Sequence, residues 1–371
     1  MESGQIHAMS EASVDDVSFL MDLKSNMSDG EFYNLTFKTL HQFIENEEMV
    51  HKLLDMATHT WEISVILEME SEIWFSEALL YLSKSFRDLM LKDKEKAVSI
   101  INNIYPRIHE SLACWHDAFF LQNHDESDNP RHISRACFRM LGDTVESVHA
   151  PHIEFIYKML VNLDSVQIHG RPESVSFGKE ISNLIEIEVF EKIYKHNLFG
   201  VSFNQWRNIA SHSSYRYDSK AKVIICNYGN NNSQTIKVTV DELIQLMNKL
   251  NQLQALHKIA VDFFIVEFMH EVDFKSMTNV ELSLETIIGQ IGNNLGLHGY
   301  KILSAQNVLG NLIFKLEDSN SNGSSGLRKV FPMLHNYLAM LYQKGMSPVF
   351  ELFDLKGNKL TEVYLERRVN G

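Results

Sequence analysis

Apolar side chains recur every three or four residues from residue 32 to about residue 162, and this spacing constrains the fold more than any other feature. It places the apolar side chains on one face of a helix, and that face must pack against other helices. We therefore expect a mainly α protein. The positions concerned are Phe37, Leu40, Phe43 and Ile44, with further clusters at 61–82 and 98–120.

The pattern changes after residue 178. We predict a helix over residues 179–196, although the alternation at 185–189 is also typical of a strand. Two strands follow over residues 222–228 and 234–240, where apolar and polar residues alternate. The turn sequence Gly-Asn-Asn-Asn-Ser at 229–233 lies between the two runs. A turn of this composition between alternating runs predicts a β-hairpin.

Thr239 and Glu242 have the spacing of a capping box, in which each side chain accepts a hydrogen bond from the backbone N–H of the other residue. Leu243 and Leu246 follow at helical spacing. We predict a long helix that begins here and reaches about His270.

The last hundred residues combine helix and strand signals. We predict a helix over 279–295, two strands within 300–317, a loop at 319–326, a helix over 327–344 and a terminal hairpin that turns at 356–358. The expected fold is a helical bundle with an inserted β-hairpin, followed by a small α+β domain. We expect a flexible leader at 1–30, a helical region at 31–170, a segment with the hairpin and the long helix at 171–270, and the α+β domain at 271–371.

Composition narrows the classes of function. The formal net charge of −14 argues against tight non-specific binding to nucleic acid, because that binding needs basic side chains. The three cysteines are too widely spaced to suggest a disulfide framework or a zinc site. The first residues lack the pattern of a secretory signal, and no run approaches the roughly 18 apolar residues of a membrane span. We expect a cytoplasmic protein with no membrane partner and no metal or other cofactor.

One short motif carries chemistry. Arg207 is followed by Asn208 and, four residues further on, by His212. Arginine and histidine at this or similar spacing arise about 1.5 times by chance in such a chain. Arg328 and His335 form a second match, which we treat as the chance one because Pro332 lies inside it.

The motif and its surroundings resemble the HEPN family of helical ribonuclease-type domains. The resemblance rests on Trp206, on the residues Arg207 to His212, on the Ser-Ser-Tyr sequence that follows and on the predicted hairpin and long helix, over about residues 179–270. It implies a metal-independent endoribonuclease, in which an RNA 2′-hydroxyl attacks its own phosphate and leaves a 2′,3′-cyclic phosphate and a 5′-hydroxyl. It also implies a homodimer, acting as a toxin or a phage-defence effector with an antitoxin or another defence-system partner.

The residue types suit this reaction. A histidine has an ordinary pKa of about 6.5, so His212 can accept or deliver a proton near neutral pH. The guanidinium of Arg207 can hold two oxygens of a phosphate whose charge grows in the transition state. Asn208 would orient the arginine or the phosphate, and Tyr215 and Ser211 are accessory candidates. In some family members, a tyrosine two residues after the histidine is a target of modification. Ser214 occupies this position here.

Arg207 and His212 would point about 140° apart on one regular helix, because each residue turns the chain by about 100°. Either the helix breaks near Ser211, or two protomers share the site. We expect RNA to bind at a local excess of positive charge, since residues 192–222 hold six basic residues and one acidic residue. The basic side chains other than Arg207 are Lys192, Lys195, Arg216, Lys220 and Lys222.

Several patterns allow a second interpretation. Arg131, Arg135 and Arg139 form a basic stripe on a helix, which either follows an RNA backbone or is a solvated face. Glu191 and Lys195 match an accessory pair of some HEPN proteins and also an ordinary helix ion pair.

His149 and His152 could suggest a metal, but they flank Pro151 and lack the spacing of a helical metal site. For the whole chain, the alternatives to an enzyme are a non-catalytic HEPN-like module that dimerises and binds nucleic acid or a protein partner, and a helical scaffold.

Overall fold

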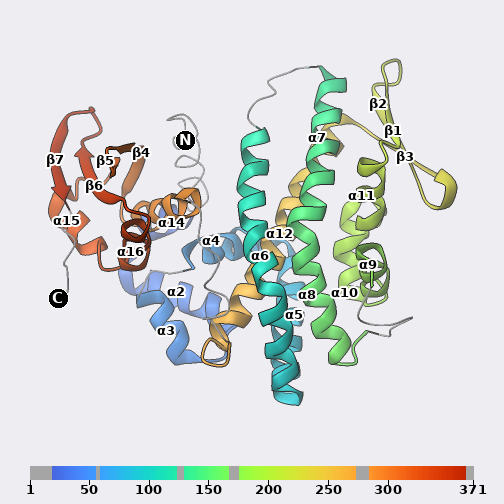
Figure 1. Ribbon diagram of the computed structural model, residues 1–371, viewed down its shortest axis with the longest axis horizontal. Helices are drawn as coiled ribbons and strands as arrows, with labels where there is room; N and C mark the ends of the chain where they lie inside the picture. Colours follow the sequence, from blue (N-terminus) through green and yellow to red (C-terminus); the bar gives the residue numbers. More distant parts are fainter. Residues whose placement is uncertain (1–18, 56–58, 123–128, 167–174, 273–283, 365–371) are drawn as a thin grey trace. The chain divides into compact units, whose positions relative to one another are not determined.

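The computed structural model describes residues 19–55, 59–122, 129–166, 175–272 and 284–364. The fold is mainly helical, with a smaller content of β-sheet (Figure 1). The chain divides into two compact units, one formed by Met1–Ser71 together with Glu281–Gly371 and the other by Glu72–Val280. This division groups residues 31–71 with the C-terminal segment, whereas the sequence analysis placed them with the central helices.

Long helices form the centre of the Glu72–Val280 unit (Figure 1). Phe86, Phe155 and Phe264 come from three of these helices, and their ring centroids lie 5.2 to 5.7 Å apart. All three side chains are buried, so this aromatic cluster lies in the core. The helices are α5 (Ile73–Lys92), α6 (Lys94–Gln122), α7 (Pro130–Thr144), α8 (Ala150–Asn162) and α12 (Val240–Glu267).

A π-turn, η2 (Val145–His149), joins α7 to α8 without a break in the helical path. Its wider hydrogen bond runs from the N–H of Ala150 to the carbonyl of Val145. Pro151 explains the local widening, because proline has no N–H to donate and its ring clashes with the carbonyl four residues earlier. The turn brings Glu146 and His149 to their positions in the unit.

The single helix predicted over residues 179–196 is wrong, because the chain forms α9 (Phe177–Leu184) and then α10 (Glu188–Tyr194). Ile187 between them has an extended backbone. Packing explains the break: nine residues at about 100° each would place Ile181 and Phe190 on opposite sides of one helix. Both side chains are buried, because α9 packs against α8 and α10 packs against α5. The break between α9 and α10 allows each helix to turn its apolar face inward.

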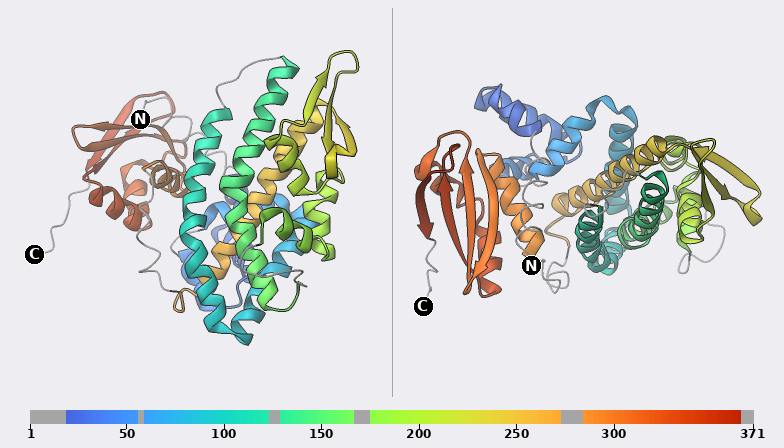
Figure 2. Two further views of the ribbon diagram at one scale, coloured as in Figure 1. Left: turned by 45° about the vertical axis from the view of Figure 1, so that its right-hand side comes forward. Right: turned by 90° about the horizontal axis from the view of Figure 1, so that it is seen from above.

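The predicted hairpin is confirmed as β2 (Val223–Tyr228) and β3 (Gln234–Val238). A third strand, β1 (Tyr215–Asp218), pairs with β2 and was missed from the sequence. The antiparallel sheet lies at the edge of the unit, beside α11 (Phe203–Ser211) and α7 (Figure 2). The capping box of Thr239 and Glu242 is confirmed at the start of α12, which ends at Glu267, three residues before the expected end.

The other unit contains α2 (Asp29–His41), α3 (Glu47–Asp55) and α4 (Thr60–Glu68). Residues 1–18 of the expected leader lie outside the described residues. Residues 19–25 of the expected leader are helical, and Leu20 is buried. The C-terminal elements are α14 (Leu284–Gly296), β4 (Tyr300–Val308), β5 (Asn311–Asp318), α15 (Gly323–Val330), α16 (His335–Gln343), β6 (Ser347–Phe353) and β7 (Lys359–Tyr364).

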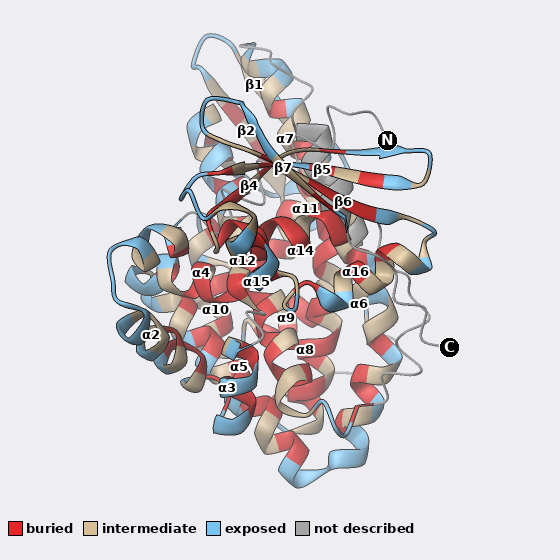
Figure 3. Cartoon of the chain, turned by 90° about the vertical axis from the view of Figure 1, so that its left-hand side faces the viewer, coloured by how far each residue is buried: buried red, intermediate tan, exposed pale blue. Residues whose placement is uncertain are grey.

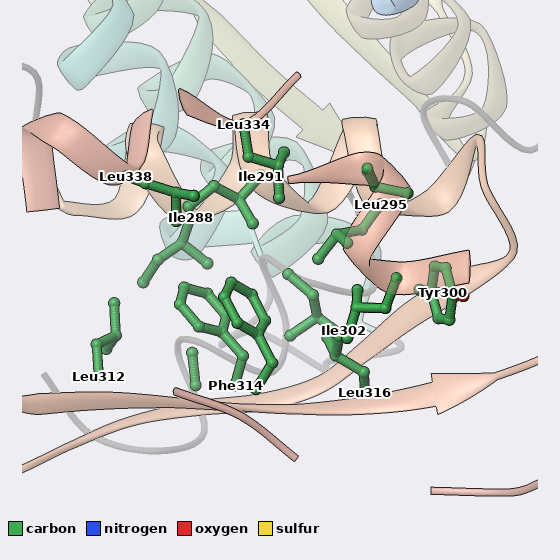
Figure 4. Close-up of a cluster of buried hydrophobic side chains, with 14 of the residues drawn as sticks. Ile288, Ile291, Leu295, Tyr300, Ile302, Leu312, Phe314, Leu316, Leu334 and Leu338 are labelled. Carbon is green, nitrogen blue, oxygen red and sulfur yellow. The ribbon is translucent and has the colours of Figure 1, made fainter. Parts of the chain in front are cut away.

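The C-terminal strands form one sheet in the order β4-β5-β6-β7, in which β5 and β6 are parallel and the other neighbours antiparallel. The terminal hairpin is confirmed, but the helix predicted over residues 327–344 is two helices, with Pro332 between them. Figure 4 shows Ile288, Ile291 and Leu295 of α14 facing Phe314 and other apolar side chains of the sheet. Buried residues, drawn in red in Figure 3, lie on helices and strands of both units.

Candidate functional site

Helix α11 carries the motif and is fixed by one apolar face. Phe203, Trp206 and Ile209 are buried, and the indole Nε1 of Trp206 donates a hydrogen bond to the carbonyl of Leu198 at 2.9 Å. Their spacing of three residues places these side chains on one side of the helix. Arg207 lies outside this buried row and is 34% exposed.

The helix ends near Ser211, which is one of the two arrangements that the sequence analysis left open. Ser211 is the last helical residue, and His212 follows as the C-cap with φ −96° and ψ 4°. Ser213 has a left-handed backbone with φ 50°, and the N–H of Ser214 donates to the carbonyl of Ile209 at 2.9 Å. This closing turn directs the chain into β1 and leaves the side chain of His212 exposed.

Arg207 is held by a residue that the sequence analysis missed. Its guanidinium donates from Nε to Glu146 Oε1 on the π-turn and forms an ion pair with the same carboxylate through Nη2. Asn208 Oδ1 accepts a hydrogen bond from Arg207 Nη1 at 3.2 Å. Asn208 thus contacts the arginine. No sequence spacing links Glu146 to the motif, because the two segments meet only through helix packing.

The structure does not bring Arg207 and His212 together within one chain. In the described part of the chain, no hydrogen bond or ion pair joins the two side chains. Arg207 contacts the π-turn, whereas His212 lies at the exposed end of α11. A single phosphate held by both groups therefore requires a second copy of the motif or a change in the position of the arginine.

A groove of about 590 Å³ lies beside the motif. Arg135, Arg139 and Glu146 contribute to it from α7 and the π-turn, and Ser211 and Tyr215 from the end of α11 and from β1. The two accessory candidates therefore lie in the same groove as two members of the arginine stripe. The sequence analysis noted this stripe and did not connect it with the motif.

Tyr215 forms part of the groove wall through a ring stack. Its ring lies 4.0 Å from that of Phe138, with an angle of 22° between the planes. Burial raises the pKa of Tyr215, and the positive charge of Arg135 opposes this effect. The phenol is therefore protonated near neutral pH, and its O–H is available as a hydrogen-bond donor.

The five other basic residues of the predicted RNA-binding set lie on two different elements. On α10, Lys192 forms ion pairs with Glu77 and Glu188, and Lys195 pairs with Glu191 at 2.9 Å. The Glu191–Lys195 contact is thus an ordinary helix ion pair. On the sheet, Arg216 in β1 and Lys220 and Lys222 in the turn after it are exposed.

The second arginine–histidine match lies in the other unit. Arg328 is in the last turn of α15, and His335 is the first residue of α16. The turn that contains Pro332 separates them, so this pair does not reproduce the helix-end arrangement of Arg207 and His212.

A cluster of histidines is buried behind the motif helix. His149, His152 and His257 are each buried, and Tyr194 Oη lies 2.8 Å from His257 Nε2. The His152 Nδ1–H donates to the carbonyl of Val148, whereas neither ring nitrogen of His149 has a partner among the described residues. Burial lowers the pKa of His149 to about 3 and that of His152 to about 4, and it also lowers that of His257. The three rings are therefore neutral at physiological pH.

The residues that the structure describes contain no group of three or more histidine, cysteine, aspartate or glutamate side chains that could hold a metal ion. Cys137 and Cys226 are free thiols. Within the described ranges, every helix is too short or too polar to cross a bilayer. Comparison of the chain with protein-family models, with curated proteins and with solved structures found no match in any of the three.

Proposed function

We propose that the protein is a metal-independent endoribonuclease that acts in the cytoplasm. The observation that carries this proposal is the end of α11 between Arg207 and His212, which leaves the imidazole exposed. Acid–base cleavage of an RNA phosphodiester needs an imidazole and a guanidinium at the same phosphate, and a second copy of the motif would have to bring the two groups together. The groove beside the motif gives a strand access to this end of the helix.

In the proposed reaction, an imidazole removes the proton from an RNA 2′-hydroxyl, and the oxygen attacks the neighbouring phosphorus. The bond from phosphorus to the 5′-oxygen then breaks, and an imidazolium supplies the proton to this leaving oxygen. The products are a 2′,3′-cyclic phosphate and a 5′-hydroxyl. Arg207 stabilises the negative charge that grows on the phosphate oxygens in the transition state.

The proposed active form is a homodimer. In one chain Arg207 is engaged by Glu146 and does not contact His212. A two-fold axis near the end of α11 would place two copies of the motif in one cleft and supply both an acid and a base. As a toxin or phage-defence effector, such a nuclease would need an antitoxin or another defence-system partner to restrain it.

A second candidate is a non-catalytic module that binds RNA. The ion pair with Glu146 favours it, because this carboxylate neutralises the cation that the phosphate would need. In that case the groove would bind RNA and the motif would not cleave it.

A cleavage assay separates the two candidates. The full-length protein is incubated with RNA in EDTA, the ends of the products are identified, and the oligomeric state is measured by light scattering. We expect cyclic-phosphate ends from the wild type and their loss from His212→Ala and Arg207→Ala. His270→Ala, which changes an exposed histidine outside the motif, serves as the matched control and should cleave normally. Intact RNA with the wild-type dimer, or cleavage that survives both motif substitutions, would exclude the proposed site.

A further inference from the structure

Three arginines on α7 form one exposed row. Arg131, Arg135 and Arg139 are spaced four residues apart, so they lie on the same side of the helix at intervals of about 6 Å. Among the described residues, Arg131 and Arg135 have no ion-pair partner, and Arg139 lies 4.0 Å from Asp143 in an exposed pair. Within the described residues, two of the three charges therefore have no ion-pair partner.

This row, the arginine face (Arg131, Arg135 and Arg139), continues into the groove beside the motif. Arg135 and Arg139 line the groove, and further along the same helical path Glu146 lines it as well. Glu146 contacts Arg207, so the groove leads from the arginines of α7, past the carboxylates of Asp143 and Glu146, to the motif arginine. The opposite wall carries the hydroxyl of Ser211 and the ring of Tyr215.

The groove has the features of a site for single-stranded nucleic acid. Such sites combine cations that follow the phosphates with aromatic rings on which bases stack. Here the cations are Arg135 and Arg139, and the ring is that of the half-buried Tyr215, which stacks on the buried Phe138. In a chain with a net charge of −14, RNA can bind only where positive charge is concentrated locally.

We propose that the arginine face binds the phosphate backbone of single-stranded RNA and that the strand follows the groove from Arg131 toward Arg207. This inference rests on the proposed nuclease function, because it names the path by which the substrate reaches the motif. It assigns Arg131 and Arg135 to the binding of flanking nucleotides and not to the chemistry.

The test measures binding separately from cleavage. The probe is a fluorescent 2′-O-methyl oligouridine of about ten nucleotides, a length within the range of single-strand sites. Its methylated 2′-oxygen cannot attack, so it binds without being cleaved. Its affinity for the full-length protein is followed by fluorescence anisotropy at increasing salt, for the wild type and for the double variant Arg131→Gln/Arg135→Gln.

The control is Lys84→Gln/Lys96→Gln, which removes the same charge at two exposed positions on α5 and α6. We expect the arginine variant to bind about tenfold more weakly at about 50 mM salt, and the slope of log affinity against log salt to fall by about 1.4, or about 0.7 for each lost phosphate contact. The control should change the slope little. The single variant Arg131→Gln should give about half of the change in slope.

Equal losses of affinity in the arginine variant and in the lysine control would overturn the proposal. So would a duplex RNA or polyglutamate that binds as tightly as the oligouridine, since either would indicate a surface for any polyanion. If the probe binds through the arginine face and unmodified RNA is not cleaved, the proposed nuclease function fails and the RNA path stands. Cleavage that is unaffected in the arginine variant, together with unchanged probe affinity, would reject the path and leave the nuclease site in place.

Discussion

The guanidinium of Arg207 lies against the carboxylate of Glu146, which is 61 residues earlier in the sequence. The two side chains are 34% and 47% exposed, so water screens their attraction. Exposed ion pairs stabilise proteins by roughly 0 to 1 kcal/mol. A phosphate that offers two oxygens to the arginine can therefore compete with Glu146. The pair orients the motif arginine without burying it.

The first prediction concerns this carboxylate. Replacing Glu146 with glutamine removes the charge that competes with RNA for Arg207, and it keeps the size of the side chain. We expect up to about fivefold tighter binding of the 2′-O-methyl oligouridine, which corresponds to about 1 kcal/mol. Anisotropy titrations measure the change.

The control for that experiment is Asp143→Asn, which removes the same charge from the same groove but from a residue paired with Arg139. It should tighten binding less than Glu146→Gln does. Weaker binding by Glu146→Gln would show that the carboxylate holds Arg207 in the position that RNA requires, and would reject the competition argument.

The second prediction is a loss of stability in mild acid. The pKa values of His149, His152 and His257 lie below the ordinary value of about 6.5 in the folded state. The unfolded chain therefore binds more protons as the pH falls below this value, and acid favours unfolding. Each histidine should lower the free energy of unfolding by about 1.4 kcal/mol when the pH falls from 7.5 to 5.5.

Glu180 acts in the opposite direction. Burial and the nearby negative charge of Glu154 raise its pKa to about 7, so the folded state holds a proton that the unfolded state releases. Its contribution to stability is present at low pH and is lost as the pH rises through 7. Three histidines outweigh one carboxyl group, so we expect a net loss of stability on acidification.

His149→Leu isolates the effect of one histidine, because neither of its ring nitrogens has a partner among the described residues. The free energy of unfolding is measured in urea at pH 7.5 and at pH 5.5. The difference between the two values should be about 1.4 kcal/mol smaller in this variant than in the wild type. The exposed His270→Leu should leave the difference unchanged. An unchanged difference in His149→Leu would mean that folding does not lower the pKa of this ring.

The third prediction tests the capping box of α12. Thr239 accepts a hydrogen bond from the N–H of Glu242, and Glu242 accepts one from the N–H of Thr239. Thr239→Ala should lower the free energy of unfolding by about 1 kcal/mol. Ser176→Ala at the start of α9 is the control, since Ser176 makes no capping hydrogen bond through its side chain. Equal losses of stability in urea unfolding would contradict this assignment.

The fourth prediction concerns close packing in α15. A Cβ atom at Gly326 would lie 2.4 Å from Tyr300 Oη and 2.7 Å from Asn322 Cβ. Gly326→Ala should therefore destabilise its unit by about 1 to 3 kcal/mol. At Gly30 in α2 an added Cβ meets nothing within 4 Å, so Gly30→Ala should be neutral or stabilising. Calorimetric melting compares the two, and similar melting temperatures would refute the packing argument.

The sequence predicted the elements whose signals are local. The capping box of Thr239 and the strands on both sides of residues 229–233 depend on residues close together in the chain. It also located the motif residues and the arginine stripe, because these are patterns of residue type and spacing.

The sequence did not predict contacts between distant segments. It missed β1, because four residues next to a motif carry too weak an alternation signal to indicate a strand without the partner strand β2. It predicted one helix where α9 and α10 turn separate faces toward α8 and α5. No pattern in the sequence indicated that Glu146 contacts Arg207.

The order of residues along the chain thus determined a mainly helical protein, the start of its longest central helix and the candidates for its chemistry, since helix periodicity, capping and turns are set by near neighbours. The tertiary structure alone decided that Glu146 meets Arg207, that Arg135 meets Tyr215 in one groove, and that residues 19–71 belong with the C-terminal sheet. The physical reason is that these contacts depend on how buried faces pack together, and local propensity does not specify that packing.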